Sequence, residues 1–303
     1  MDSVQYYIII GLCIVYFLIG SFGNIISIII FTRKEFNKQP TTVYLIVSNV
    51  INIITVFYLP FIVMPEVWLK LIDGTIGCQI FGGFTIILAE LQPWVYSICS
   101  VDRCITTLAP FKFSFKNKLK FQLTLIFICA IILILLCIPF LYYYREYQLD
   151  YDANKTVCLF PQSLELNWVN TYFKYQFGLF RTVLPFIITI TASFITLYNL
   201  CSSKLKLNNH DWKKMQKEFH FARTLITMDI LFVIFRIPNT VYASLQSSLI
   251  YAYDFLFSVF VFLGVLHNVF IFLIFILFNK IYLELFKILI FRKKRKVTQR
   301  SEY

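Results

Sequence analysis

Charged residues are rare in the apolar segments of this 303-residue chain, so those that occur there are the first candidates for chemistry. Glu90, Arg181, Asp229 and Arg236 are the four charges in such segments, and His267 is the histidine in one. No second histidine and no pair of carboxylates shares the segment of His267, and the cysteines show no metal or catalytic pattern. Glycine-rich phosphate loops are also missing. We therefore expect no enzymatic active site, no metal and no cofactor.

The composition places nearly the whole chain in a membrane. Hydrophobic residues make up 59% of it and charged residues 15%, whereas a soluble domain is about half apolar. The apolar runs are about 20 residues or longer and lack the alternation of a barrel strand, and lipid leaves no partner for unsatisfied backbone groups. The sequence therefore predicts an all-α membrane protein.

The net charge of +12 follows from where the basic residues stand. Of the 28 Lys and Arg residues, 22 are placed on one side of the membrane: 13 in the three inner loops, 1 at Arg103 and 8 after the seventh span. Positive charge is retained on the cytoplasmic side during insertion. This bias predicts an extracellular amino terminus and a cytoplasmic carboxyl terminus, and no nucleic-acid partner is needed to explain it.

The hydropathy pattern predicts a seven-transmembrane helix bundle within one membrane domain, residues 1–291, followed by a basic cytoplasmic tail, residues 292–303. The predicted spans are about 5–31, 41–65, 75–109, 119–142, 172–202, 213–247 and 253–278. The spacing of polar residues in 280–291 predicts a short amphipathic eighth helix along the inner leaflet, with Lys280, Glu284 and Lys287 on its polar face. The cations of the tail predict attraction to anionic lipid, about 1 kcal/mol each.

The third predicted span carries the most specific motif. Cys78 precedes Asp102 by 24 residues, so the two lie on opposite sides of a bilayer core roughly 30 Å thick. Cys78, Asp102-Arg103-Cys104-Ile105, Leu108 and Pro110 together resemble the third span of the rhodopsin-like (class A) G-protein-coupled receptors. Cys104 replaces the Tyr that this family usually has.

Other spans carry weaker forms of the family's motifs, which indicates a divergent branch. Gly23-Asn24 resembles its Gly-Asn pair, although an Asn in a span can equally be a helix-to-helix hydrogen bond. The stretch Leu45 to Asn49 resembles Leu-Ala-x-x-Asp, with Asn49 in place of the acid. The remaining matches are Pro185 in the fifth span and Phe232 and Pro238 in the sixth, where Arg236 replaces Trp. The Asn-Pro-x-x-Tyr motif is absent from Ile271 to Phe275.

The resemblance implies roles for both ends of the bundle. Asp102, Arg103 and Cys104 would form the G-protein-coupling end, with Arg103 held in the resting state by Glu218, although a Glu in a Lys-rich loop is usually a solvated surface residue. Cys78 and Cys158 are the two cysteines placed outside, where an oxidising environment favours a disulfide. Asn154 begins a glycosylation sequon on the same side.

The ligand-pocket candidates are Thr85, Glu90, Arg181, Arg236 and His267. Thr85 stands where amine receptors of the family carry an Asp, which disfavours an amine and leaves a peptide or a small chemosensory molecule. Glu90 is expected to neutralise Arg181, which would leave Arg236 to meet an acidic group of the ligand. Alternatively, Arg236 is satisfied by His267, Asn268 and backbone carbonyls.

The sequence thus predicts a plasma-membrane receptor that transduces an extracellular ligand into activation of a heterotrimeric G protein by movement of its sixth helix. The alternative is a membrane transporter or channel that uses the charged residues at mid-membrane depth.

Overall fold

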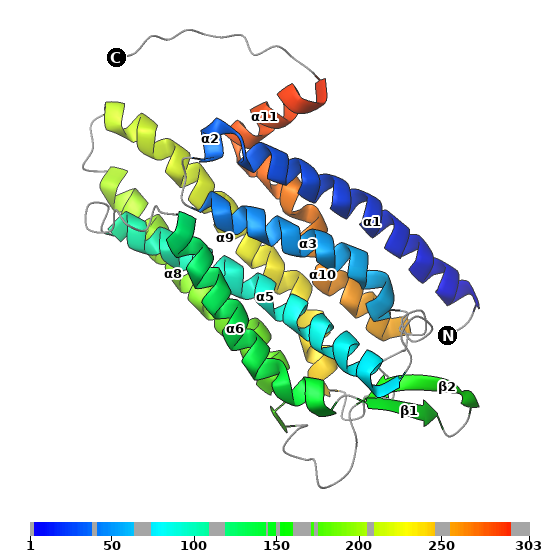
Figure 1. The fold of residues 1–303 in the computed structure, drawn as a ribbon. Coiled ribbons are helices and arrows are strands. Elements are labelled where there is room, and N and C mark those ends of the chain that lie inside the picture. Colours follow the sequence, from blue (N-terminus) through cyan, green and yellow to red (C-terminus); the bar gives the residue numbers. More distant parts are fainter. Residues whose placement is uncertain are drawn as a thin grey trace.

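The computed structural model describes residues 3–37, 41–63, 74–108, 119–143, 145–149, 152–159, 171–172, 175–204, 209–245 and 255–291. Within these residues, seven helical segments are long and apolar enough to cross a membrane. They comprise α1 (Ser3–Phe31), α3 (Thr42–Val63), α5 (Gly74–Leu108), α6 (Leu119–Tyr143), α8 (Leu184–Lys204) with the π-helical segment η3 (Gln176–Val183) before it, α9 (Asn209–Leu245) and α10 (Phe255–Phe278). They pack side by side in one bundle (Figure 1), which confirms the predicted seven-helix fold.

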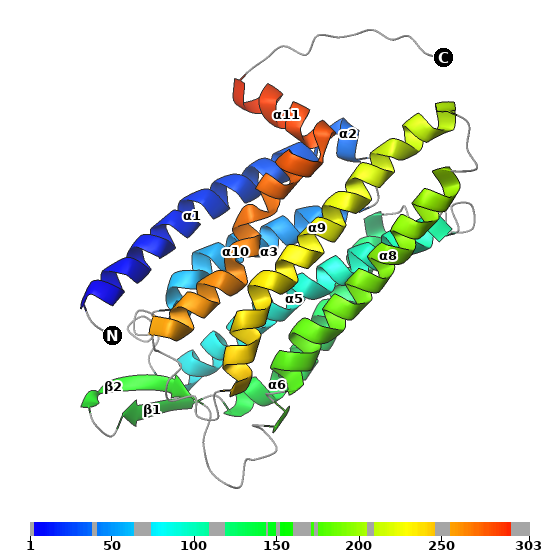
Figure 2. The same cartoon turned by 180° about the vertical axis from the view of Figure 1, so that it is seen from behind.

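Short elements cover the two ends of the bundle. The helices α2 (Lys34–Asn37) and α11 (Lys280–Phe291) lie at one end, and the strands β1 (Arg145–Leu149) and β2 (Asp152–Leu159) lie at the other, near the amino terminus (Figures 1 and 2). The strands pair antiparallel, with Glu146 opposite Cys158. The sequence predicts an all-α fold without strands, so the hairpin is an addition to that prediction.

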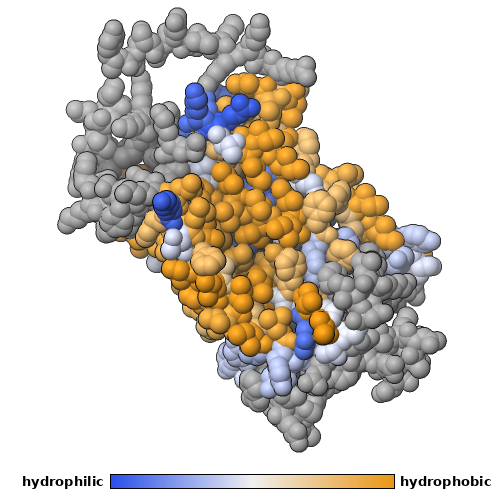
Figure 3. All heavy atoms as spheres, in the orientation of Figure 1, coloured by the Kyte–Doolittle hydropathy of each residue, from blue (hydrophilic) through white to orange (hydrophobic). Residues whose placement is uncertain are grey.

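Apolar side chains form a broad band over the outside of the bundle (Figure 3). Large hydrophobic residues that face outward include Phe127 and Leu135 on α6, Tyr198 on α8 and Leu277 on α10. The removal of such side chains from water is favourable at about 25 cal/mol per Å², so lipid contact stabilises a surface of this kind. The inside of the bundle holds the polar residues that the sites below use.

The helix α5 lies at the centre, in contact with α3, α6, η3 and α8. The helix α1 packs against α3 and α10. Its Gly23 allows close packing on α10, because a Cβ at that position would overlap the ring of Phe272. This close approach gives the Gly23-Asn24 pair a structural reason.

An aromatic cluster joins α10 and α11 to α1 and α2 at the end that carries α11. The Phe275 ring lies 5.0 Å from that of Phe31 and 5.3 Å from that of Tyr282. The Tyr282 hydroxyl lies 2.7 Å from the Ser27 hydroxyl on α1. Burial raises the pKa of Tyr282, so this phenol stays protonated and hydrogen-bonded at neutral pH. Asn279 caps α11 by accepting the Tyr282 backbone N–H at 3.1 Å.

Candidate ligand and coupling sites

Glu90 is an acidic group near the middle of α5. Its side chain is fully buried on α5, 0% exposed. Its Oε2 accepts a hydrogen bond from Gln176 Nε2 at 3.0 Å, and the Cys137 thiol of α6 lies 4.0 Å away. Arg181 and Arg236 both exert electrostatic attraction on this carboxylate. The pairing of Glu90 with Arg181 stays a prediction, and Arg236 also lies within electrostatic range of Glu90.

The π-helical segment η3 explains how two of its residues reach Glu90. The backbone N–H of Leu184 bonds the carbonyl of Leu179, five residues back, so residues five apart stack on one face, as Gln176 and Arg181 do. The proline ring of Pro185 would clash with the carbonyl four residues earlier in a regular α-helix. A wider turn before Pro185 relieves that clash.

Arg236 lies inside the bundle at the position where the family has a Trp. It is 2% exposed. Its Nη2 donates to the Ala89 carbonyl of α5 at 2.7 Å, and its Nη1 donates to the Gly264 carbonyl of α10 at 3.4 Å. The guanidinium also lies 5.6 Å from the centre of the Phe232 ring. Backbone carbonyls therefore hold Arg236, which supports the structural alternative for this residue.

His267 and Thr85 bond within their own helices. The His267 Nδ1 lies 3.1 Å from the Gly264 carbonyl, and its ring meets that of Phe232 edge-on at 4.8 Å. The Thr85 hydroxyl donates to the Phe81 carbonyl at 2.8 Å. Thr85, Arg236 and His267 thus all bond backbone carbonyls, while Arg181 and Arg236 lie within electrostatic range of Glu90.

A chain of amide side chains crosses the core from α1 to α10. Asn52 Nδ2 donates to Asn24 Oδ1 at 3.1 Å, and Gln92 Nε2 donates to Asn52 and, at 2.7 Å, to Asn268 Oδ1. Asn24 Nδ2 closes the network on the Asn268 carbonyl at 3.1 Å. Asn and Gln side chains are uncharged and can both donate and accept hydrogen bonds. This polar core therefore carries no formal charge.

The sequence motif singles out Asn49, at the position of the family's acid, and does not single out Asn52. Asn49 donates to the Leu45 carbonyl of its own helix at 2.6 Å. Three residues correspond to about 300° of rotation, so Asn49 and Asn52 lie roughly 60° apart on α3. The sequence shows two Asn residues three positions apart on the same helix. That spacing does not predict which of the two faces Gln92 of α5.

Arg103 lies at the opposite end of α5 from Cys78. Its Nε donates to the Thr41 hydroxyl, just before α3, at 3.0 Å, and Nη2 contacts the same oxygen. Asp102 and Cys104 are buried beside it. A pocket opens here between α5, α8 and α9, lined by Ser100, Arg103, Ser193, Thr196, Ala222 and Leu225. The Glu218 side chain and Pro110 lie outside the described atoms, so their predicted roles stay predictions.

Cys78 is disulfide-bonded. Six other cysteines carry free thiols, namely Cys13, Cys99, Cys104, Cys129, Cys137 and Cys201. The eighth, Cys158, lies on β2, which contacts α5, but its side chain and that of Asn154 lie outside the described atoms. The Cys78–Cys158 pairing and glycosylation at Asn154 therefore stay predictions. The described residues hold no group of three His, Cys, Asp or Glu side chains that could bind a metal.

A seven-helix membrane bundle with an Asp-Arg pair at one end and a disulfide-bonded cysteine at the other defines a class of membrane receptors. Residues 23–270 match the 7 transmembrane receptor (rhodopsin family), and the chain belongs to that family. Members of this family are receptors rather than enzymes, and their partners in general are a ligand and a G protein.

Three curated relatives are similar to parts of the chain. The N-arachidonyl glycine receptor of Homo sapiens is 25% identical over 197 residues, which cover 63% of this chain and 58% of that protein. The receptor of the same name from Macaca fascicularis is 24% identical with the same coverage. The G-protein coupled receptor homolog K2 of Swinepox virus (strain Kasza) is 32% identical over 116 residues, 37% of this chain and 30% of that protein. The chain thus spans a little over half the length of the first two.

Proposed function

We propose that this chain is a plasma-membrane receptor, with its amino terminus outside and its carboxyl terminus inside, that binds an extracellular ligand and activates a heterotrimeric G protein. The observation that carries the proposal is Arg103 at the inner end of α5, beside a pocket formed with α8 and α9. Membership of the rhodopsin family supports it. In this family, the Arg of the Asp-Arg pair contacts the G protein once the resting contacts are released.

The proposed ligand is a small molecule or peptide that carries an acidic group. Arg181 and Arg236 outnumber Glu90 in the outer half of the bundle, and a charge that faces lipid costs roughly 2.5 to 3.5 kcal/mol near mid-membrane. A ligand carboxylate would complete the balance of charge. The human relative is named for N-arachidonyl glycine, a molecule with a carboxylate, which supports a ligand of this chemistry.

Arg181 is the better candidate for first contact with that group. It is partly exposed on η3, whereas Arg236 is 2% exposed and bonded to two carbonyls. Arg236 would then act below the ligand as a positive charge that draws an anion inward. Thr85 and His267 remain proposed pocket residues.

The inner surface is proposed to rest on anionic lipid. Lys280, Glu284 and Lys287 of α11 are exposed, as are Arg33 and Lys34 near α2, and basic residues at this depth are attracted to anionic headgroups. Asn24, Pro185, Phe232 and Pro238 would serve helix packing and activation.

The experiment that tests the function is a ligand screen in cells that carry a panel of G-protein activation reporters. Acidic lipids and peptides would be screened beside their neutral esters or amides. The Arg103→Ala variant at matched surface level is the control. A hit should activate at least one reporter through the native chain and none through Arg103→Ala.

A further inference from the structure

Asp229 on α9 is a buried carboxylate that the ligand and coupling sites do not use. It is 6% exposed, and the Ser193 hydroxyl of α8 donates to its Oδ2 at 3.2 Å. It stands two turns before Arg236 on the same helix. Among the described side chains, no Lys, Arg or His provides it with an opposite charge.

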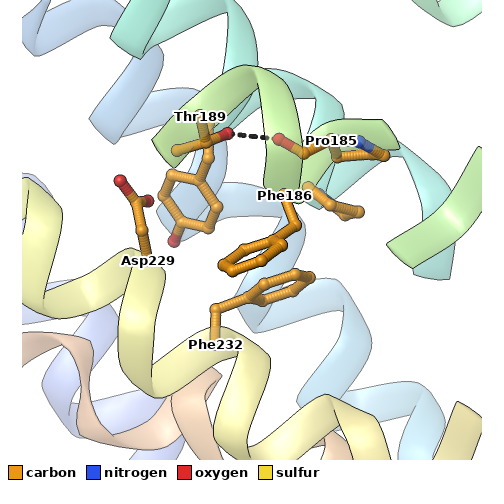
Figure 4. A pocket seen from close by; sticks show the side chains of 7 residues that line it. Pro185, Phe186, Thr189, Asp229 and Phe232 are labelled. Carbon is orange, nitrogen blue, oxygen red and sulfur yellow. Dashed lines mark hydrogen bonds between the residues drawn. The ribbon is translucent and has the colours of Figure 1, made fainter. Parts of the chain in front are cut away.

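A small cavity adjoins this carboxylate. Figure 4 shows Asp229 and Phe232 of α9 facing Pro185, Phe186 and Thr189 of α8 across it. Pro93 and Tyr96 of α5 complete the lining, and the space has room for about one water molecule. The walls are mostly proline and aromatic rings, and the Thr189 hydroxyl is already bonded to the Pro185 carbonyl at 2.7 Å.

A negative charge cannot be left uncompensated in such surroundings. A carboxylate in an apolar interior either pairs with a cation or takes up a proton. The cavity is too small for an organic ammonium ion. A sodium ion would have to exchange its hydration water for one carboxylate and a few hydroxyls, of which those of Thr189 and Ser193 are already bonded.

We propose that Asp229 binds a proton when α8 and α9 are packed as in this structure, and releases it when α9 moves away and opens the carboxyl group to water. Asp229 is thereby a proton site in the inner half of the bundle, separate from the ligand site. Proton binding by Asp229 does not depend on the proposed function. Its effect on signalling rests on the proposed G-protein coupling.

The neighbouring groups leave Asp229 as the proton acceptor. On α5, Tyr96 and Cys99 are within electrostatic range of it, and both are neutral at physiological pH. On α8, Ser193 and Thr189 are hydroxyls without ionisation in this range. On α10, His267 packs its ring against Phe232, and on α9 the next charged residue is Arg236, which Ala89 and Gly264 hold.

The sign of the effect follows from linkage. The packed arrangement holds one more proton than the opened one, so a rise in pH favours opening, by up to about tenfold per pH unit between the two midpoints. If α9 moves outward in the active receptor, ligand-free signalling rises with pH and falls on acidification. Asp229→Asn keeps the shape without ionising and removes this dependence.

Infrared difference spectroscopy tests proton binding without a ligand or a G protein. The purified receptor in lipid nanodiscs should show the carbonyl stretch of a protonated carboxylic acid at neutral pH, and that band should be missing from Asp229→Asn. Ser193→Ala removes a donor to the carboxylate, so the band should persist to higher pH than in the native chain. Glu90→Gln is the matched control, which should keep the Asp229 band.

Two results would overturn the proton site. One is an Asp229 that is ionised at neutral pH in the packed receptor. The other is a band that disappears when sodium replaces choline at constant pH, which would assign the site to a cation. If the band behaves as expected but signalling does not change with pH, proton binding stands and its coupling to α9 movement is wrong.

Discussion

Arg236 Nη2 donates a hydrogen bond to the carbonyl oxygen of Ala89 at 2.7 Å. This bond joins α9 to α5 in the middle of the bundle, and the second bond to Gly264 joins α9 to α10. A cation held in this way positions three helices. The partly exposed Arg181 is the group that we propose to meet a ligand.

Arg181→Gln and Arg236→Gln should therefore differ in their effect on ligand binding. For an acidic agonist from the screen, Arg181→Gln should weaken binding by about 1 to 3 kcal/mol, the range for a lost charge-assisted hydrogen bond. The neutral ester should be affected little. Arg236→Gln should weaken both ligands, because it changes the placement of helices. Unchanged affinity of the acid for the Arg181 variant would refute the anion contact.

Cys78→Ser and Cys158→Ser should each lower the amount of receptor at the cell surface. A disulfide between them closes a loop of about 80 residues, worth on the order of 4 kcal/mol in the chain-entropy model. The double variant should be no worse than either single one, because both remove the same bond. Cys201→Ser, at an exposed free thiol, is the matched control. Alkylation of both thiols in the native receptor would disprove the pairing.

Thr41→Val should raise ligand-free signalling. The Thr41 hydroxyl accepts from Arg103, and Val keeps the shape while it removes the acceptor. Glu218→Ala should act in the same direction, since loss of a resting restraint of about 1 to 3 kcal/mol raises a rare active population tenfold or so. Basal reporter activity at matched surface levels measures both. Thr42→Val, whose hydroxyl bonds Phe36 instead, should leave basal signalling unchanged.

Ligand affinity should be insensitive to sodium, because the amide core of Asn24, Asn52, Gln92 and Asn268 carries no formal charge. A sodium ion there would exchange its water for neutral dipoles alone. Asn52→Asp supplies the missing carboxylate and should create a sodium dependence. Binding measured in sodium and in choline, for both chains, checks this. A steep loss of native affinity in sodium would contradict the account.

Sequence patterns were sufficient for the parts of the fold that depend on neighbouring residues. Apolar runs marked the seven helices, and the distance from Cys78 to Arg103 placed those residues at opposite ends. Contacts between residues far apart in the chain could not be predicted from sequence patterns. The carbonyls that hold Arg236 belong to Ala89 and Gly264. Every residue has a backbone carbonyl, so the residue types do not indicate which carbonyls accept these hydrogen bonds.

The remaining differences also have physical causes. The π-helical turn before Pro185 rotates Gln176 and Arg181 onto one face, which a regular helix would not do. The hairpin of β1 and β2 depends on cross-strand pairing within a polar stretch. For both, the outcome depends on packing as well as on local preference.

The most direct test of the proposed function is nucleotide exchange on purified G proteins, measured with the receptor in nanodiscs. Glu218→Ala serves as the starting chain, because its basal activity should be raised, and Arg103→Ala is added to it. We expect exchange above that of empty nanodiscs for at least one class of G protein, and a return to that background once Arg103 is replaced. Exchange at background for every class, or exchange that is unaffected by Arg103→Ala, would contradict coupling through this end of α5.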